Sequence, residues 1–158
     1  GAGQEHVFNV VAPYFIAGLA GVYSGLGEHM LEESIAHAKE RKYTSGTSLA
    51  EIETVQIHLA KMYNLVNSSV CAAKEATRSA AAGEEDALAK ILSARIIACE
   101  MVIEAGRLGM RVGGGKAYNK AGSMERLLRD AYAGQIMAPS ADVLTVWLGK
   151  AITGLPLV

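Results

Sequence analysis

Three consecutive glycines, Gly113–Gly115, stand between Arg111 and Lys116, with only Val112 intervening. Consecutive glycines after a helix can bring bare backbone N–H groups close to a phosphate, because no side chain stands in the way. The phosphate-binding pattern G-x-x-x-x-G-K-[ST] is not met, since Met110 takes the place of its first glycine and alanine follows the lysine. On pattern alone the run indicates the end of a helix, and a phosphate site is the alternative.

Patterns for metal binding and nucleophilic catalysis are weaker. Helical bundles carry di-iron sites built from Glu-x-x-His pairs, but none of the four histidines has a glutamate three residues before it. His29, Glu33 and His37 share a helix face at four-residue spacing, which is more typical of a solvated polar face than of a metal cage. No G-x-S-x-G elbow offers a nucleophilic serine. Cys71 and Cys99 lack metal-ligand spacing, so we expect no metal site and two reduced cysteines in the core.

The composition is that of one globular, helix-rich domain. Of the 158 residues, 51% are hydrophobic and 20% are charged, with only three prolines. The formal net charge of −1 leaves no basic excess, so we expect no nucleic acid partner. We expect a cytoplasmic protein, because no basic segment precedes the first apolar stretch as it would in a signal peptide. The chain starts at Gly1 without methionine, which we interpret as a piece of a longer protein, with removal of a tag as the alternative.

Apolar spacing and proline positions predict the helices. Prolines occur only at positions 13, 139 and 156, which leaves two long spans free to be helical. Ser48 and Glu51 form an S-x-x-E capping box ahead of the second long helix. The predicted helices cover residues 5–42, 48 to 80–83, 84–113, 123–133 and 139–153, with Pro139 in the first turn of the last one. They predict an all-α fold for residues 1–158, an antiparallel up-down four-helix-type bundle with additional short C-terminal helices.

The first predicted helix contains an uncharged stretch over residues 7–27. About 20 apolar residues can span a membrane, and Gly21-x-x-x-Gly25 matches a close-packing motif of membrane helices. Asn9, Pro13 and Ser24 interrupt the stretch, and glutamates follow it. We therefore expect no membrane span, but a helix buried in the bundle and in an oligomer interface. The face expected to be buried carries Leu19, Val22, Leu26, Met30 and Ile35.

The C-terminal third of the chain resembles a known family. Residues 114–134 read G-G-K-A-Y-N-K-A-G-S-M-E-R-L-L-R-D-A-Y-A-G. This resembles the acyl-CoA dehydrogenase signature, which is a G-G-x-G-[FY] turn, a spacer and E-[KR]-x-x-R-D-A. Upstream, A-K-E-R-K at 38–42 and L-A-K-M at 59–62 resemble segments of the same family in the same order.

The resemblance implies the C-terminal helical domain of an FAD-dependent oxidoreductase that acts on acyl-CoA thioesters. The N-terminal helical domain and the middle β-domain of such an enzyme are not in this chain. The resemblance also implies a homo-oligomer, either a dimer or a tetramer, and an isolated domain without turnover.

Through the same resemblance, several residues are implied to contact FAD. Arg41 matches the arginine that reaches the FAD phosphates, a charge-assisted contact. Gly114 and Gly115 match glycines whose backbone approaches the pyrophosphate, and Ser140 falls at a hydroxyl position near the flavin.

Other positions in the implied cofactor site depart from the family pattern. Arg111 and Glu53 stand where the family usually has glutamine, and the phenylalanine that stacks on adenine is either missing or replaced by Tyr43. Ala117 replaces a glycine of the turn.

The largest departure concerns the catalytic base. Dehydrogenation of an acyl-CoA needs a carboxylate that removes the α-proton while hydride leaves to the flavin. Ala138 stands at the position of that glutamate, with Asp142 about one helical turn away, and residues 12–16, where other members carry the base, contain no acid. We therefore expect no catalytic residue in this chain. Two alternatives stay open: a flavin-dependent monooxygenase on the same scaffold, which does not need the glutamate, and a bundle used only for assembly or membrane attachment.

Overall fold

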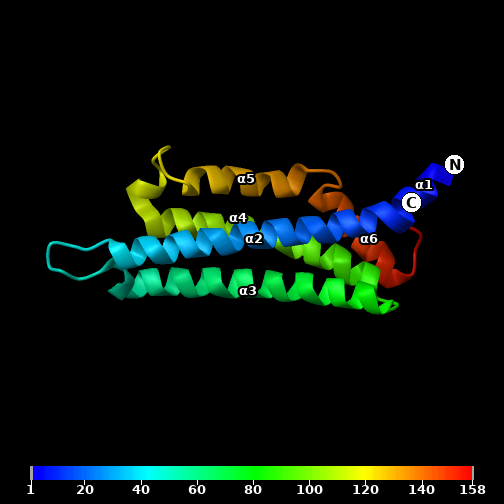
Figure 1. Ribbon diagram of the computed structural model, residues 1–158, viewed down its shortest axis with the longest axis horizontal. Helices are drawn as coiled ribbons and strands as arrows, with labels where there is room; N and C mark the ends of the chain where they lie inside the picture. The colour runs from blue at the N-terminus through cyan, green and yellow to red at the C-terminus, as the bar shows by residue number, and fades with distance from the viewer. Residues whose placement is uncertain (1, 158) are drawn as a thin grey trace.

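The computed structural model describes residues 2–157, and these form helices and their connections without a strand. In chain order the elements are α1 (Ala2–His6), the π-helix η1 (Val7–Val11), α2 (Ala12–Glu40), the 3-10 helix η2 (Leu49–Glu51), α3 (Glu53–Ala82), α4 (Ala87–Ala117), α5 (Met124–Ile136) and α6 (Ala141–Thr153). The three long helices lie side by side, and α4 contacts α2, α3, α5 and α6 (Figure 1). The predicted all-α bundle with short C-terminal helices is confirmed.

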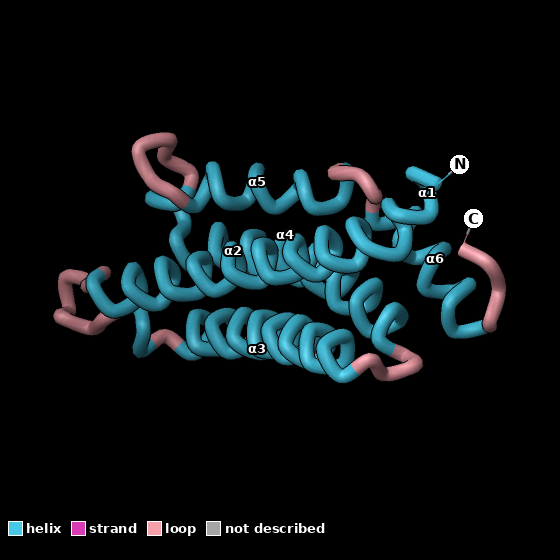
Figure 2. The backbone as a smooth tube through the Cα atoms, turned by 45° about the vertical axis from the view of Figure 1, so that its right-hand side comes forward, coloured by secondary structure: helices cyan, strands magenta, loops and turns pink. Residues whose placement is uncertain are grey.

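The connections between the long helices lie at the two ends of the bundle. Figure 2 places the α2–α3 and α4–α5 connections at one end and the α3–α4 and α5–α6 connections at the other. The end of α2 at Glu40 and the end of α4 at Ala117 are therefore neighbours, although they lie far apart in sequence.

The first helix is longer and less buried than expected. α1, η1 and α2 follow one another without a break from Ala2 to Glu40, whereas the predicted bounds were 5–42. Val22, expected on the buried face, is 61% exposed. The buried face instead contains small residues such as Ala20, Ser24 and Gly27. At Gly27 the side chains of Met101 from α4 and Val66 from α3 fill the space that the glycine leaves, so the hydropathy of α2 alone does not identify its inner face.

The same helix is the one described segment that is long and apolar enough to cross a membrane, judged by length and composition. Only 22% of its most apolar 18-residue window is buried within this chain. The expected burial in the bundle is therefore only partial, because the outer face of α2 has no cover from the described residues 2–157.

Two helix starts differ in detail from the predicted ones. The Ser48–Glu51 capping box is present, with the Ser48 N–H donating to Glu51 Oε1 at 2.7 Å, but it caps η2 rather than α3. The last helix begins one residue after Ser140, whose Oγ accepts the Val143 N–H at 3.5 Å. Pro139 therefore precedes the cap instead of occupying the first turn.

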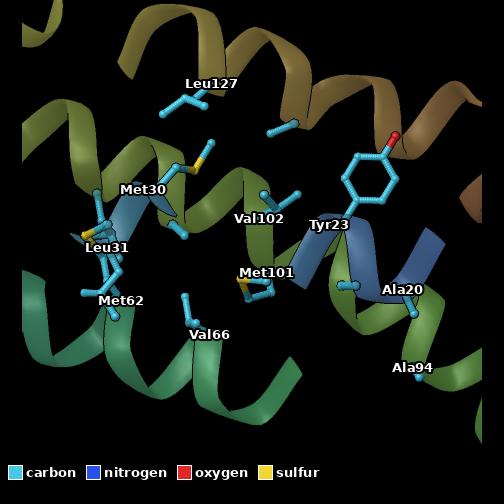
Figure 3. Packing of buried hydrophobic residues seen from close by; sticks show 14 of the residues in the cluster. Ala20, Tyr23, Met30, Leu31, Met62, Val66, Ala94, Met101, Val102 and Leu127 are labelled. Carbon is cyan, nitrogen blue, oxygen red and sulfur yellow. The ribbon is translucent and has the colours of Figure 1, made fainter. Parts of the chain in front are cut away.

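The core lies where α2, α3, α4 and α5 meet. Met30, Met62 and Met101 are 0–3% exposed, and Figure 3 shows their side chains converging between the helices with Val102 and Leu127. The flexible thioether side chains fill irregular gaps of this kind. The expectation of two core cysteines is half wrong: Cys99 is buried, but Cys71 is exposed because it lies on the outer face of α3.

Candidate functional site

The glycine run forms a bend in the last turns of α4. Gly114 has φ of 52° and ψ of −135°, which is outside the helical region, and the helix resumes for one more turn to Ala117. A positive φ favours glycine because a Cβ would clash with the backbone. The run therefore bends the helix instead of ending it at 113–115 as predicted, and the bend leaves Gly114 and Gly115 exposed.

A cavity of about 660 Å³ lies beside this bend. Its walls come from the end of α2, the connection to η2 and the last turns of α4. The lining residues are His37, Glu40, Arg41, Tyr43, Leu49, Arg111, Val112, Gly113, Gly114, Gly115 and Lys116.

Five of the eight residues implied to contact the cofactor line this one cavity: Arg41, Tyr43, Arg111, Gly114 and Gly115. They come from segments far apart in sequence, and they meet because α3 runs back between α2 and α4, so that both helices end at the same end of the bundle (Figure 2). The family resemblance therefore indicates a set of residues that the fold gathers in one place.

Backbone hydrogen bonds hold Arg41 in position at the end of α2. Its N–H donates to the His37 carbonyl at 3.0 Å, and its own carbonyl accepts the Leu49 N–H at 2.8 Å. The Tyr43 N–H donates to the Thr47 carbonyl at 2.9 Å, which closes the loop between them. The arginine is thus anchored by its backbone while its exposed side chain stays free to meet a ligand.

The cavity carries an excess of positive charge. Arg41, Arg111 and Lys116 line it together with a single carboxylate, Glu40. The ion pairs in the described residues involve other cations, among them Arg78, Lys90 and Arg107. Clustered cations attract an anion. With the exposed glycine bend in the same wall, where no side chain keeps a ligand from the backbone, the arrangement suits a phosphate or diphosphate.

Two lining residues had no predicted role in a phosphate site. His37 was noted only for its spacing from Glu33, and Lys116 only as the residue after the glycines. Burial lowers the pKa of His37, and the positive charges of Lys116 and Arg41 lower it further, while Glu40 acts in the opposite direction. A signal was present in the sequence, since His37 lies one helical turn before Arg41.

Three implied cofactor residues do not line this cavity. Glu53 is the exposed first residue of α3, while Ser140 and Asp142 lie at the start of α6. The 13 residues of α5 form a helix roughly 20 Å long that runs back along α4. The start of α6 therefore lies at the end of the bundle opposite to the cavity (Figures 1 and 2). Their implied contacts stay predictions.

The position implied for the catalytic base carries no acid. Ala138 lies exposed in the connection between α5 and α6, and Asp142, in the first turn of α6, is also exposed. Within residues 2–157, no group of three or more His, Cys, Asp or Glu side chains is arranged to hold a metal ion.

Comparison with known proteins links this geometry to one family. The family described as "Acyl-CoA dehydrogenase, C-terminal domain" matches residues 17–153. The chain is 27% identical over 128 residues to the probable acyl-CoA dehydrogenase FadE25 of Mycobacterium tuberculosis, covering 81% of this chain and 33% of the relative. It is 24% identical to the cyclohex-1-ene-1-carbonyl-CoA dehydrogenase of Geobacter metallireducens, with the same coverage. The chain thus spans about a third of the length of these curated relatives.

Solved structures show the same fold. The butyryl-CoA dehydrogenase of Megasphaera elsdenii superposes with a TM-score of 0.81 at 20% identity, covering 87% of this chain and 36% of that one. A structure of PigA with FAD and proline superposes with a TM-score of 0.82 at 18% identity, covering 89% and 36% of the two chains.

Proposed function

Because the chain belongs to the acyl-CoA dehydrogenase C-terminal domain family, we propose that it forms the helical wall of an FAD site in a larger flavoprotein oxidoreductase. The observation that carries this proposal is the cavity that joins two arginines to the glycine bend. A cationic wall with an exposed glycine backbone fits the diphosphate of FAD, which carries two negative charges.

The residues present assign parts of FAD to parts of the cavity. Arg41 and Arg111 would hold the diphosphate by charge-assisted hydrogen bonds, and the exposed backbone of Gly114 and Gly115 would leave room for it. Tyr43 is 46% exposed at the rim, where its ring is available to stack on adenine. The flavin itself supplies hydride acceptance when it is bound.

We also propose that the complete site needs another copy of the chain. Ser140 and Asp142 lie at the start of α6, which is at the far end of the bundle from the cavity (Figure 1), so we propose that different copies supply the two groups of residues to one FAD. A dimer or tetramer in which one copy supplies the diphosphate wall and another the flavin side satisfies both. The partly uncovered α2 is consistent with such an assembly.

A single substitution pair tests the cofactor role in the full-length protein. Replacing Arg41 by alanine removes a charge-assisted contact and should weaken FAD affinity about 10- to 100-fold. Replacing Arg107 by alanine is the matched control, since this exposed α4 arginine pairs with Glu104 and does not line the cavity. Flavin fluorescence after gel filtration measures retained FAD. Equal FAD retention in the two variants would argue against the proposal.

For the reaction, we propose oxidation of an acyl-CoA thioester, with a base that lies outside residues 2–157. Anaerobic bleaching of the flavin in the full-length protein by acyl-CoA thioesters would support it. The second candidate is a flavin-dependent monooxygenase, which Ala138 favours because that chemistry does not use the glutamate. Rapid oxidation of added reduced flavin with hydroxylated product would select the second reaction.

The isolated 158 residues should show neither activity, because the β-domain of the proposed enzyme is not in this chain. Measurable acyl-CoA oxidation by the isolated chain would contradict this. We further propose a cytoplasmic protein without a membrane span. Recovery of the full-length protein in the detergent-free soluble fraction of its native cells tests that, and recovery only from membranes would favour the attachment alternative.

A further inference from the structure

His37 lies at the boundary between two adjoining cavities at the end of the bundle. The larger cavity holds Arg41 and the glycine bend, and a second cavity of about 290 Å³ extends toward the α4–α5 connection. His37, Glu40, Gly113 and Lys116 line both. A ligand in the larger cavity therefore changes the surroundings of the imidazole directly.

The charged groups around His37 come from two helices. On α2 they are Glu33, Glu40 and Arg41, and on α4 they are Arg111 and Lys116.

The acidic members of this set are not equivalent. Glu33 is already engaged, because Ser123 Oγ from the α4–α5 connection donates to its carboxylate at 2.8 Å. Glu40 is the carboxylate that favours a proton on His37, and it acts against burial, Lys116 and Arg41 together. In the free chain, burial and the two cations outweigh Glu40 and lower the pKa of His37, so the imidazole is neutral near neutral pH.

We propose that His37 is a further binding group of the phosphate site and takes up a proton from solvent when a diphosphate binds beside Arg41, Lys116 and the glycine bend. This rests on the proposed function, since it requires a diphosphate in that cavity. Two bound negative charges offset the field of the cations, and phosphate oxygens accept a hydrogen bond from the imidazolium. Lys116 then contributes twice, by attracting the anion and by keeping His37 neutral until the anion arrives.

The sign of the pH dependence follows from this linkage. Binding raises the pKa of His37, so the bound state carries more protons than the free state between the two pKa values. Affinity for a diphosphate therefore rises as pH falls through the bound-state pKa, and it levels off below the free-state pKa. We expect affinity to increase about threefold or more between about pH 8 and about pH 6.

ADP-ribose is a suitable probe for the 158-residue chain. Its diphosphate is a diester, so its charge stays constant over this pH range, unlike the terminal phosphate of ADP, which titrates near pH 6. Histidine ring protons and the Gly114 and Gly115 amides are followed by NMR during pH titrations with and without ADP-ribose. Adenosine is the uncharged control ligand, and exposed His29 on the same helix is the reference histidine.

The expected result is movement of both glycine amides together with a raised His37 pKa, while His29 is unchanged and adenosine has no effect. His37→Gln should flatten the pH dependence of affinity, and the matched His29→Gln should retain it. In Lys116→Gln the free-state pKa of His37 should rise toward its ordinary value.

Two negative outcomes separate the inference from the proposed function. If the glycine amides move but the pKa of His37 does not, the inference is overturned and the diphosphate site stands. If millimolar ADP-ribose moves neither amide, the inference and the diphosphate site both fail.

Discussion

Arg95 is the most unusual residue of the core, because its fully buried guanidinium has no carboxylate partner among residues 2–157. It is 0% exposed and lies on α4. Its Nη2 donates to the Gly134 carbonyl at 2.9 Å, its Nη1 contacts Cys99 Sγ, and its guanidinium carbon lies 4.7 Å from the centre of the Tyr23 ring. Burial lowers its pKa, while Tyr23 acts in the opposite direction. A carbonyl and an aromatic face thus replace a counter-ion, and they connect α4 to both α2 and α5.

Two substitutions at Arg95 should distinguish the contribution of its side-chain volume to stability from the effect of its buried charge. Arg95→Ala leaves a cavity and an unpaired carbonyl and should lower the free energy of unfolding by about 3–5 kcal/mol. Arg95→Met keeps most of the volume and removes the cost of a buried charge, so its loss should be smaller, about 1–2 kcal/mol. Urea unfolding of the isolated chain measures both values. Equal losses would mean that packing around Arg95 contributes little.

At the scale of elements, an ion-pair network fastens the turn between α3 and α4. Arg78 pairs with Glu75 and Glu84, and Lys90 pairs with Glu75, Glu84 and Asp86. The hydrogen bonds from Arg78 and Lys90 lower the pKa of both Glu75 and Glu84 to about 2. Each folded-state pKa is depressed, so the stabilisation is present above the ordinary value of 4.5 and is lost as pH falls from there toward about 2.

The network predicts an acid-dependent loss of stability specific to these glutamates. Between about pH 5 and about pH 2, the urea midpoint of the original chain should fall further than that of Glu84→Gln, which has already lost one titrating partner. Glu85→Gln is the matched control, because Glu85 is an exposed neighbour of Glu84 at the same turn. Within the described residues, Glu85 forms no ion pair and no side-chain hydrogen bond. If the urea midpoint of Glu84→Gln falls with pH in parallel with that of the original chain, the role of the network is contradicted. Added salt should reduce the difference between the two midpoints, because the ion pairs are partly exposed.

The glycines of α2 differ in what surrounds them. A Cβ on Gly27 would come within 2.8 Å of the end of Met101 and 3.4 Å of Val66, whereas a Cβ on Gly25 meets nothing within 4 Å. In the isolated chain, Gly25→Ala should therefore raise the free energy of unfolding by about 1 kcal/mol through helix propensity. Gly27→Leu should lower it by about 1–3 kcal/mol through overpacking. Urea midpoints that move in the same direction would contradict this assignment of the buried face.

The helices show which structural features the sequence patterns predict and which they do not. Helix type and order follow from apolar spacing and proline positions, because both act within a few residues. The buried face of α2 does not follow, because residues such as Gly27 are selected by the methionine opposite them and have low hydropathy themselves. The close-packing motif at Gly21 and Gly25 likewise points to a face that is open in this chain.

At the scale of the whole molecule, five predicted site residues meet because α2 and α4 end side by side. This follows from the antiparallel order of successive helices, which the sequence could predict. The roles proposed for His37 and Lys116 could not be read from pattern alone, since they depend on shared burial and on distances between helices. The separation of Ser140 from the diphosphate cavity also emerges only from the fold. The proposed division of the FAD site between two ends of the bundle predicts that assembly and cofactor binding are linked.

The outer face of α2 is where such assembly is expected. Along one side of η1 and α2, apolar residues and one glycine recur at three- and four-residue spacing: Val7 and Val11 of η1, then Tyr14, Gly18 and Val22 of α2. Tyr14 is 80% exposed. A continuous apolar stripe of this kind is normally covered by another molecule.

The isolated chain should therefore self-associate, and Val22→Glu should shift it toward monomer in size-exclusion chromatography with light scattering. Tyr63→Glu is the matched control, since Tyr63 is 59% exposed on α3. Self-association that both substitutions leave intact would exclude this face, and sedimentation of the original chain with lipid vesicles would assign its cover to a membrane instead.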